Sequence, residues 1–163
     1  MDATATFEDF YGANRDRVFR TVSLALPGDA DAAEATAEAF VRAFTRWRSV
    51  SRHPNPVGWV VKTAINHQRS RWRRPRIGLP VPAVESAPPE PLEPGIVLAL
   101  RALPERQRQV VALRFLCDLS TEQTADALGI ATGTVTAHVH RALETLRSSL
   151  ADLEEEGSTH VDR

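Results

Sequence analysis

The sequence predicts an all-α protein made of two small helical domains joined by a proline-rich linker. Apolar residues recur at helical spacing, and no run of alternating β-branched residues predicts a strand. Residues 75–94 contain seven prolines in twenty positions, and proline interrupts helices and inner strands because it lacks an N–H and fixes φ. We therefore expect a first module at 1–75, a linker at 76–94, a second module at 95–151 and an acidic tail at 152–163.

The first module is expected to hold three helices. The first spans about 6–26 and is capped by Thr6, the second spans about 29–47, and the third spans about 55–74. The third opens with a capping asparagine followed by proline at the first helical position, a common way to start a helix. The linker that follows is extended and semi-rigid, and at roughly 3 Å per residue it could span up to about 60 Å.

The second module is expected to hold four helices. They span about 95–103, 104–117, 121–129 and 132–150. Ser120 and Gln123 form a capping box for the third of these helices, which ends at Gly129. The last dozen residues are acidic and polar, and we expect them to be frayed.

Two faces of the third helix differ in chemistry. One apolar stripe is predicted to pack inward, and it consists of Val57, Val61, Ile65 and Trp72. The other stripe is basic, amide-bearing and aromatic, and it consists of Trp59, Lys62, Asn66, Arg69 and Arg73. Basic groups bind phosphates and an aromatic ring can stack on an unpaired base. The alternatives are that Trp59 belongs to the core and that the arginines are solvated.

The charge of the chain is unevenly distributed. The formal net charge is −1, from 20 Lys and Arg against 21 Asp and Glu. Residues 39–84 nevertheless contain ten bases, Arg73 and Arg74 among them, and no acid. Because the Debye length is about 8 Å at physiological salt, distant acids do not cancel this block locally. The block favours nucleic acid as a partner, with a solvated face or a site for an acidic protein as alternatives.

Residues 121–143 have the layout of a helix-turn-helix motif, two helices separated by a glycine turn. The positions of the last helix that are expected to face inward are occupied by Val135, Val139, Ala142, Leu143, Leu146 and Leu150. The residues left to face outward are Thr134, Thr136, Ala137, His138 and Arg141. The N-terminal half of a recognition helix meets base edges in the major groove, and an arginine there can bind guanine bidentately. Plain helical hairpins imitate this pattern, so it favours DNA without requiring it.

No sequence pattern indicates catalysis, a cofactor or a metal. There is no Cys/His cluster with metal-ligand spacing, no glycine-rich phosphate loop and no nucleophile–base arrangement. The lone Cys117 is expected to be a small buried apolar residue in a reducing compartment. Neither a secretory signal nor an apolar run of eighteen residues is visible. We expect a cytoplasmic protein that is not an enzyme and has no small-molecule substrate and no membrane contact.

Residues 103–147 closely resemble domain 4 of extracytoplasmic-function (ECF) sigma factors, a compact branch of the sigma-70 family. Leu113-Arg114-Phe115, Leu128-Gly129-Ile130 and Gly133-Thr134-Val135 are among the residues in register. The first module is similar to domain 2 of that family. DAAEATAEAFVRAFTRW matches the segment that binds core polymerase, and NPVGWVVKTAINHQRSRWRR matches the helix around the promoter-melting element.

The resemblance implies a sigma factor that directs RNA polymerase core, through its β and β′ subunits, to promoter DNA. The implied polymerase-binding residues are Glu34, Glu38, Phe40, Val41 and Phe44. The residues implied in −10 recognition and melting are Trp59, Lys62, Asn66, Arg69, Arg73 and Arg74. The outward set of the last helix would read the −35 element. An anti-sigma factor is a further candidate partner.

The chain departs from the family pattern at several positions. Glu34 and Ala37 stand where the family usually has aspartate and glutamine, and Thr136 and His138 stand where it favours Lys and Arg. Weaker or differently specified −35 binding is therefore expected. Two rival interpretations remain open. TVTAHVHRALETL also resembles the reading helix of LuxR-type regulators, and the helices could form a protein-interaction module.

Overall fold

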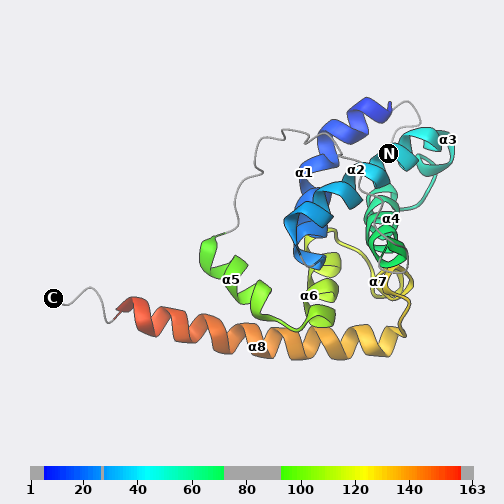
Figure 1. The fold of residues 1–163 in the computed structure, drawn as a ribbon. Coiled ribbons are helices and arrows are strands. Elements are labelled where there is room, and N and C mark those ends of the chain that lie inside the picture. The colour runs from blue at the N-terminus through cyan, green and yellow to red at the C-terminus, as the bar shows by residue number, and fades with distance from the viewer. Residues whose placement is uncertain (1–5, 27, 72–92, 159–163) are drawn as a thin grey trace.

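The computed structural model describes residues 6–26, 28–71 and 93–158, and every regular element in those ranges is a helix. The first module contains α1 (Phe7–Ala25), α2 (Asp29–Thr45), the single turn α3 (Trp47–Val50) and α4 (Pro56–Arg71). α2 and α4 pack against each other and both contact α1 (Figure 1). The all-α fold class predicted from the sequence is confirmed.

The second module begins with α5 (Pro94–Ala102) and α6 (Glu105–Val111). A π-helical turn, η1 (Ala112–Leu116), continues α6, and α7 (Thr121–Leu128) and α8 (Thr132–Ser158) follow. In Figure 1, α8 lies along the base of the molecule, and α5, α6 and α7 all contact it. The predicted four-helix arrangement is thus present, with η1 as an unexpected end to its second helix.

Local side-chain chemistry explains where the helices begin. Thr6 caps α1 through a capping box in which its hydroxyl oxygen accepts from the backbone N–H of Asp9 at 3.2 Å. Ser120 and Gln123 form the predicted capping box of α7. Asn55 precedes α4, and its side-chain oxygen accepts from the N–H of Gly58 at 2.8 Å. These bonds satisfy N–H groups that lack partners within the helix.

The interior is formed by small and medium aliphatic residues from both modules. Val18, Val22, Val61 and Ile65 are buried in the first module, as are Leu113 and Leu128 in the second. All of them belong to one connected buried cluster. The inward residues predicted for α4 are confirmed at Val57, Val61 and Ile65, whereas Trp72 lies outside the described residues.

The ends of two helices differ from the sequence prediction. The second helix was expected to reach Trp47, but it ends at Thr45, and α3 starts after Arg46. The last helix was expected to stop near Leu150, but α8 continues to Ser158. The sequence after Leu150, ADLEEE, consists of strong helix formers apart from one aspartate, so propensity favours continuation. The predicted tail at 152–163 therefore begins as helix, and Leu150, expected inside, is 36% exposed.

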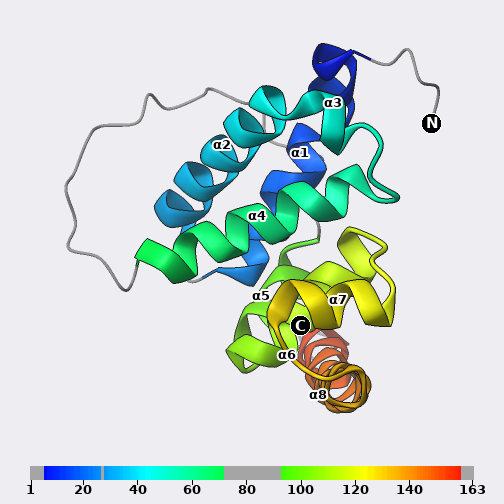
Figure 2. The ribbon, with the colours of Figure 1, turned by 90° about the vertical axis from the view of Figure 1, so that its right-hand side faces the viewer.

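The two modules lie against each other. α1 contacts both α6 and η1, and α4 contacts α7. Figure 2 shows α7 next to α4, with α8 seen almost end-on on the far side of the second module. The predicted linker falls almost entirely at 72–92, outside the described residues, so its extended path is not tested.

Candidate nucleic-acid and polymerase interfaces

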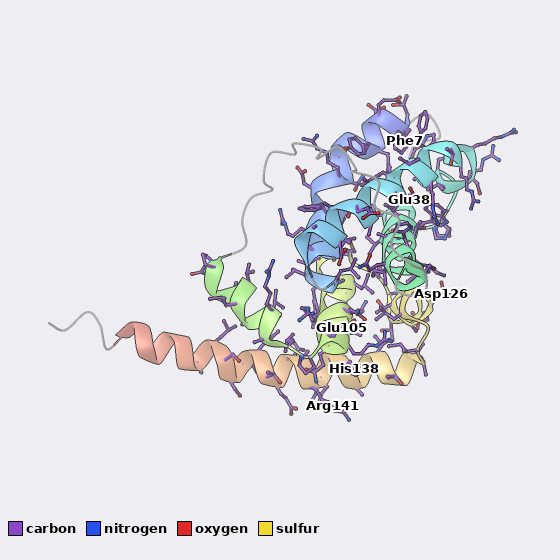
Figure 3. All side chains as sticks on the ribbon, viewed as in Figure 1. Phe7, Glu38, Glu105, Asp126, His138 and Arg141 are labelled. Atoms are coloured by element: carbon purple, nitrogen blue, oxygen red, sulfur yellow. The ribbon has the colours of Figure 1, made fainter. Side chains whose placement is uncertain are left out.

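The first predicted surface is the N-terminal half of α8. Its helix-turn-helix geometry depends on Gly129, which adopts a left-handed conformation (φ 66°, ψ 40°) and ends α7. Val135 and Ala142 are buried, and this fixes the rotation of α8 on the rest of the module. Thr134, Thr136 and Arg141 are exposed as a result. Figure 3 shows Arg141 directed away from the remainder of the protein.

Two members of the predicted reading set are less accessible. Ala137 and His138 are half-buried. The Nδ1 atom of His138 is fully covered and finds no hydrogen-bond partner among the described residues. His138 therefore combines a partly packed ring with a position beside the exposed threonines. Its neighbour His140 faces solvent and lies 3.4 Å from Glu144, so the two histidines do not converge on one site.

The second predicted surface is the polar stripe of α4. Asn66 is exposed, Lys62 and Trp59 are half-buried, and Trp59 packs partly against the core. The expectation that Trp59 contributes to the core is compatible with this position. The backbone of Arg69 is helical, but the side chain of Arg69 and all of Arg73 and Arg74 lie outside the described residues.

The stripe faces the second module across a shallow cavity of about 190 Å³. Trp59, Lys62 and Asn66 line it on the α4 side, and Gln123 and Asp126 line it on the α7 side. Lys62 donates to the carboxylate of Asp126 across this gap. The Asn55 amide lies 3.5 Å from the side-chain oxygen of Gln123. Asp126 and Gln123 were not predicted as functional residues, because their partners are more than sixty positions away in the sequence.

The third predicted surface lies on α2. Val41 and Phe44 are each 58% exposed and lie three positions apart, on one face of the helix. The Phe44 ring packs edge-on to Phe7, with ring centroids 5.1 Å apart. Glu38 accepts from Arg42 at 2.8 Å one turn further along the helix. An apolar patch with charged neighbours therefore covers the end of α2.

Phe40, also predicted to bind polymerase, is buried rather than exposed. It is 5% exposed and packs edge-on to Tyr11, with ring centroids 4.9 Å apart. Its role in the structure is to hold α2 on α1. Glu34 is half-buried one turn before Glu38. Of the predicted set, Val41 and Phe44 are the apolar side chains that a partner could reach.

His67 connects the α4 stripe to α2. Its Nε2 atom is covered and has no hydrogen-bond partner among the described side chains. Burial lowers the pKa of His67 below its ordinary value, Glu38 opposes that shift, and Arg42 reinforces it. Burial between the two helices therefore disfavours the protonated imidazole of His67.

Neither a metal site nor a membrane span is found in the described parts of the chain. Residues 6–26, 28–71 and 93–158 contain no cluster of three His, Cys, Asp or Glu side chains that could hold a metal ion. Within the same ranges no helix is both long enough and apolar enough to cross a membrane. Cys117 is buried, as predicted, and its thiol lies 3.0 Å from the hydroxyl of Thr21.

These features define a class of protein: a two-module helical DNA-binding protein with one helix-turn-helix module. The family described as "Sigma-70, region 4" matches residues 95–146, which include the helix-turn-helix. Sequence similarity extends over both modules. The RNA polymerase sigma-E factor of Streptomyces antibioticus is 31% identical, with 88% of this chain and 84% of that protein covered. The sigma-E factor of Streptomyces coelicolor is 29% identical, with 92% of this chain and 89% of that protein covered.

The fold is also found in solved structures. The sigma factor RpoE from Bartonella quintana, crystallised with the anti-sigma factor NepR, superposes with a TM-score of 0.67. It covers 96% of this chain and 98% of that one at 18% identity. The chain belongs to the extracytoplasmic-function sigma factors of the sigma-70 family. It is therefore an RNA polymerase sigma factor, and the resemblance inferred from the sequence is confirmed.

Proposed function

We propose that the first module acts as sigma region 2 and the second as sigma region 4, with residues 76–94 as the connection. In this proposal the chain recruits RNA polymerase core to promoters whose −35 element is read by α8 and whose −10 element is opened at α4. The observation that carries the proposal is the exposed reading face of α8, held within the segment that matches sigma-70 region 4.

Thr134, Thr136 and Arg141 would contact the −35 element, with Ala137 and His138 shaping the same surface. The threonine hydroxyls can bond phosphate, and Arg141 can select guanine. The near-neutral reading face supports modest affinity for duplex DNA by the free protein. Most of the binding free energy would then come from the polymerase and from the basic residues that precede the linker.

The α4 stripe would hold the −10 region. Trp59 can stack on an unpaired base, Asn66 can bond a base edge, and Lys62 with Arg69, Arg73 and Arg74 can bind the backbone. Replacing Arg73 and Arg74 together with alanine is expected to weaken open-complex formation most at low salt, and the difference from wild type should narrow as salt rises, because fewer phosphate contacts give a shallower salt dependence. Permanganate footprinting across a salt series measures this, and identical melting by both proteins at every salt would count against the phosphate role.

The polymerase clamp would bind the end of α2. Val41 and Phe44 would supply apolar contact, and Glu34 and Glu38 would supply charge.

Val41→Glu places a charge in the middle of the patch and is expected to lower affinity for core polymerase. Ala33→Glu is the matched control, because Ala33 is also exposed on α2 and lies two turns away. Equal losses of affinity for core polymerase in the two variants would show that the end of α2 is not part of the interface.

The chain would act by binding and not by bond chemistry, in the cytoplasm, where polymerase works. An anti-sigma factor stays a candidate partner, as one is named in the RpoE complex. Similarity to sigma factors across both modules disfavours the two rival interpretations, a stand-alone LuxR-like regulator and a protein-interaction module.

Reconstitution with core polymerase on a library of promoter sequences tests the proposal directly. We expect start-site-specific transcripts that depend on this chain. If the protein is folded and no such transcript forms on any template, the proposed function is contradicted. A gel shift without polymerase tests the rival regulator, because tight and specific duplex binding by the chain alone would support that alternative.

A further inference from the structure

The interface between the two modules contains several polar contacts that join distant parts of the chain. The Arg17 guanidinium on α1 donates to the carbonyl of Leu116 at 2.7 Å and to the carboxylate of Asp118 at 2.5 Å. Arg108 on α6 donates to the carbonyl of Leu24 at the end of α1, at 2.8 Å. Lys62 on α4 donates to Asp126 on α7. These bonds hold the second module at two separate places on the first.

The two ion pairs between the modules, Arg17 with Asp118 and Lys62 with Asp126, are oriented in the same way. Each base belongs to the first module, and each acid belongs to the second. Lys62 is one of the residues assigned above to the DNA backbone. Its ammonium group here meets the carboxylate of Asp126, and a carboxylate offers the same anionic oxygen acceptors as a phosphate.

Apolar packing brings the two surfaces close around this ion pair. Leu119, which precedes α7, is 1% exposed. One of its methyl groups lies 2.6 Å from the position that a Cβ at Gly58 would take. The absence of a side chain at Gly58 therefore permits the close approach of the second module to the start of α4. Among the described side chains of the stripe, Trp59 and Lys62 are half-buried beside this contact, whereas Asn66 stays exposed.

We propose that α7 is an internal competitor of promoter DNA, in which Asp126 occupies Lys62 in place of a phosphate and closes the second module over the α4 stripe. The inference rests on the proposed −10 role of α4. The reading face of α8 is not covered in this closed arrangement, since Thr134, Thr136 and Arg141 remain exposed. The closed chain thus masks one DNA surface and leaves the other open.

The ion pairs are suited to reversible opening. The Lys62 side chain is 37% exposed and that of Asp126 is 72% exposed. Pairs this exposed are weak and are screened by salt. A polyanion that carries many phosphates can therefore displace a single carboxylate. Docking of the first module on polymerase and of α4 on DNA would favour the open arrangement without any covalent change.

The single cysteine of the chain can report on separation of the two modules, and no cysteine has to be introduced for this purpose. Cys117 is buried at the module interface against Thr21 of α1, and its burial raises the pKa of the thiol. Separation of the modules would expose it to an alkylating reagent. The rate of Cys117 alkylation in the free, full-length chain therefore measures how often the modules separate, provided that the variants remain folded by far-UV circular dichroism.

Charge reversal at the ion pair tests the proposal. Asp126→Lys and Lys62→Asp are each expected to accelerate Cys117 alkylation by about threefold or more. The double swap, Lys62→Asp with Asp126→Lys, is expected to restore the rate toward wild type, because it re-forms the pair in the opposite orientation. Glu144→Lys is the matched control, since Glu144 is exposed on α8 and its ion-pair partner, His140, belongs to the same helix.

Three results would overturn the proposal: single variants that label at the wild-type rate, a double swap without rescue, or a Glu144→Lys rate equal to that of Asp126→Lys. If a reversal variant fails to fold, a salt series on the wild-type chain tests the proposal instead. Its alkylation rate should rise between about 0.05 and about 0.5 M salt as the pairs are screened, and a constant rate would contradict the competitor role. No polymerase or promoter is needed, so failure here would leave the sigma function itself untouched.

Discussion

Arg141 is exposed on the proposed reading face of α8, and its guanidinium is expected to act at one base pair. Arg141→Ala is expected to cost about 1–3 kcal/mol of discrimination at a single −35 position, which is the usual value of a bidentate arginine–guanine pair. Binding of the reconstituted holoenzyme to duplexes that vary one position at a time measures this loss. Arg147→Ala is the control, because Arg147 is exposed on the same helix beyond the reading residues. A uniform loss at all positions would instead indicate a phosphate contact.

His67 gives the fold a pH dependence whose sign follows from its burial. The pKa of His67 is lowered in the folded chain, so below about pH 6.5 the unfolded chain takes up a proton that the folded chain resists. The free energy of unfolding is therefore expected to fall as pH drops from about 7 through the folded pKa. Urea unfolding at a series of pH values measures the trend.

The substitution His67→Gln isolates the contribution of His67 to the pH dependence of the free energy of unfolding. His67→Gln has no imidazole to titrate and should flatten the decline below about pH 6.5. An unchanged slope in the His67 variant would show that other groups cause the pH dependence.

At the scale of elements, the turn between α7 and α8 depends on the conformation of one residue. No atom lies within 4 Å of a Cβ placed at Gly129, so a larger residue meets strain in the backbone and not in packing. Gly129→Ala is expected to lower the free energy of unfolding by about 1–2 kcal/mol, the cost of a left-handed alanine. Gly129→Asn should cost less, because asparagine tolerates this region. Equal losses in urea unfolding would argue against backbone strain.

Helices with chemical boundary signals were predictable from the sequence. Thr6 starts α1, Asn55-Pro56 starts α4, and Ser120 and Gly129 bound α7, all through local interactions that a sequence reveals. The π-helical turn η1 was not predictable, because ALRFL has the apolar pattern of an ordinary helix. η1 lies against α1, where Arg17 binds the carbonyl of Leu116, so long-range contacts accompany its geometry.

At the scale of the molecule, the candidate site was only partly visible in the sequence. Helical periodicity predicted that Thr134, Thr136 and Arg141 are exposed on α8, because exposure there depends on spacing within one helix. The family resemblance put Phe40 among the polymerase-binding residues, although Phe40 is buried against Tyr11. The pair of Lys62 with Asp126 joins residues 64 positions apart and has no local signature. The same holds for the pair of Arg17 with Asp118, which also joins a base of the first module to an acid of the second.

The shared core predicts that the two modules unfold together. One connected cluster of buried residues runs through both, from Val18 and Val22 to Leu113 and Leu128. All three tryptophans belong to the first module, so their fluorescence follows that module, whereas far-UV circular dichroism follows every helix. We expect the two signals to give the same midpoint in urea, as coupled unfolding requires.

Truncating Leu119, which is buried between the modules, should separate these signals. Leu119→Ala removes apolar contact with α4 and is expected to destabilise the chain by about 2–5 kcal/mol. Because the loss falls on the interface, the second module should unfold first, and the circular dichroism midpoint should move below the fluorescence midpoint. Leu128→Ala is the comparison, as Leu128 is fully buried at the end of α7. Two midpoints in the wild-type chain would show that the modules are stable independently and that the closed arrangement adds little to either.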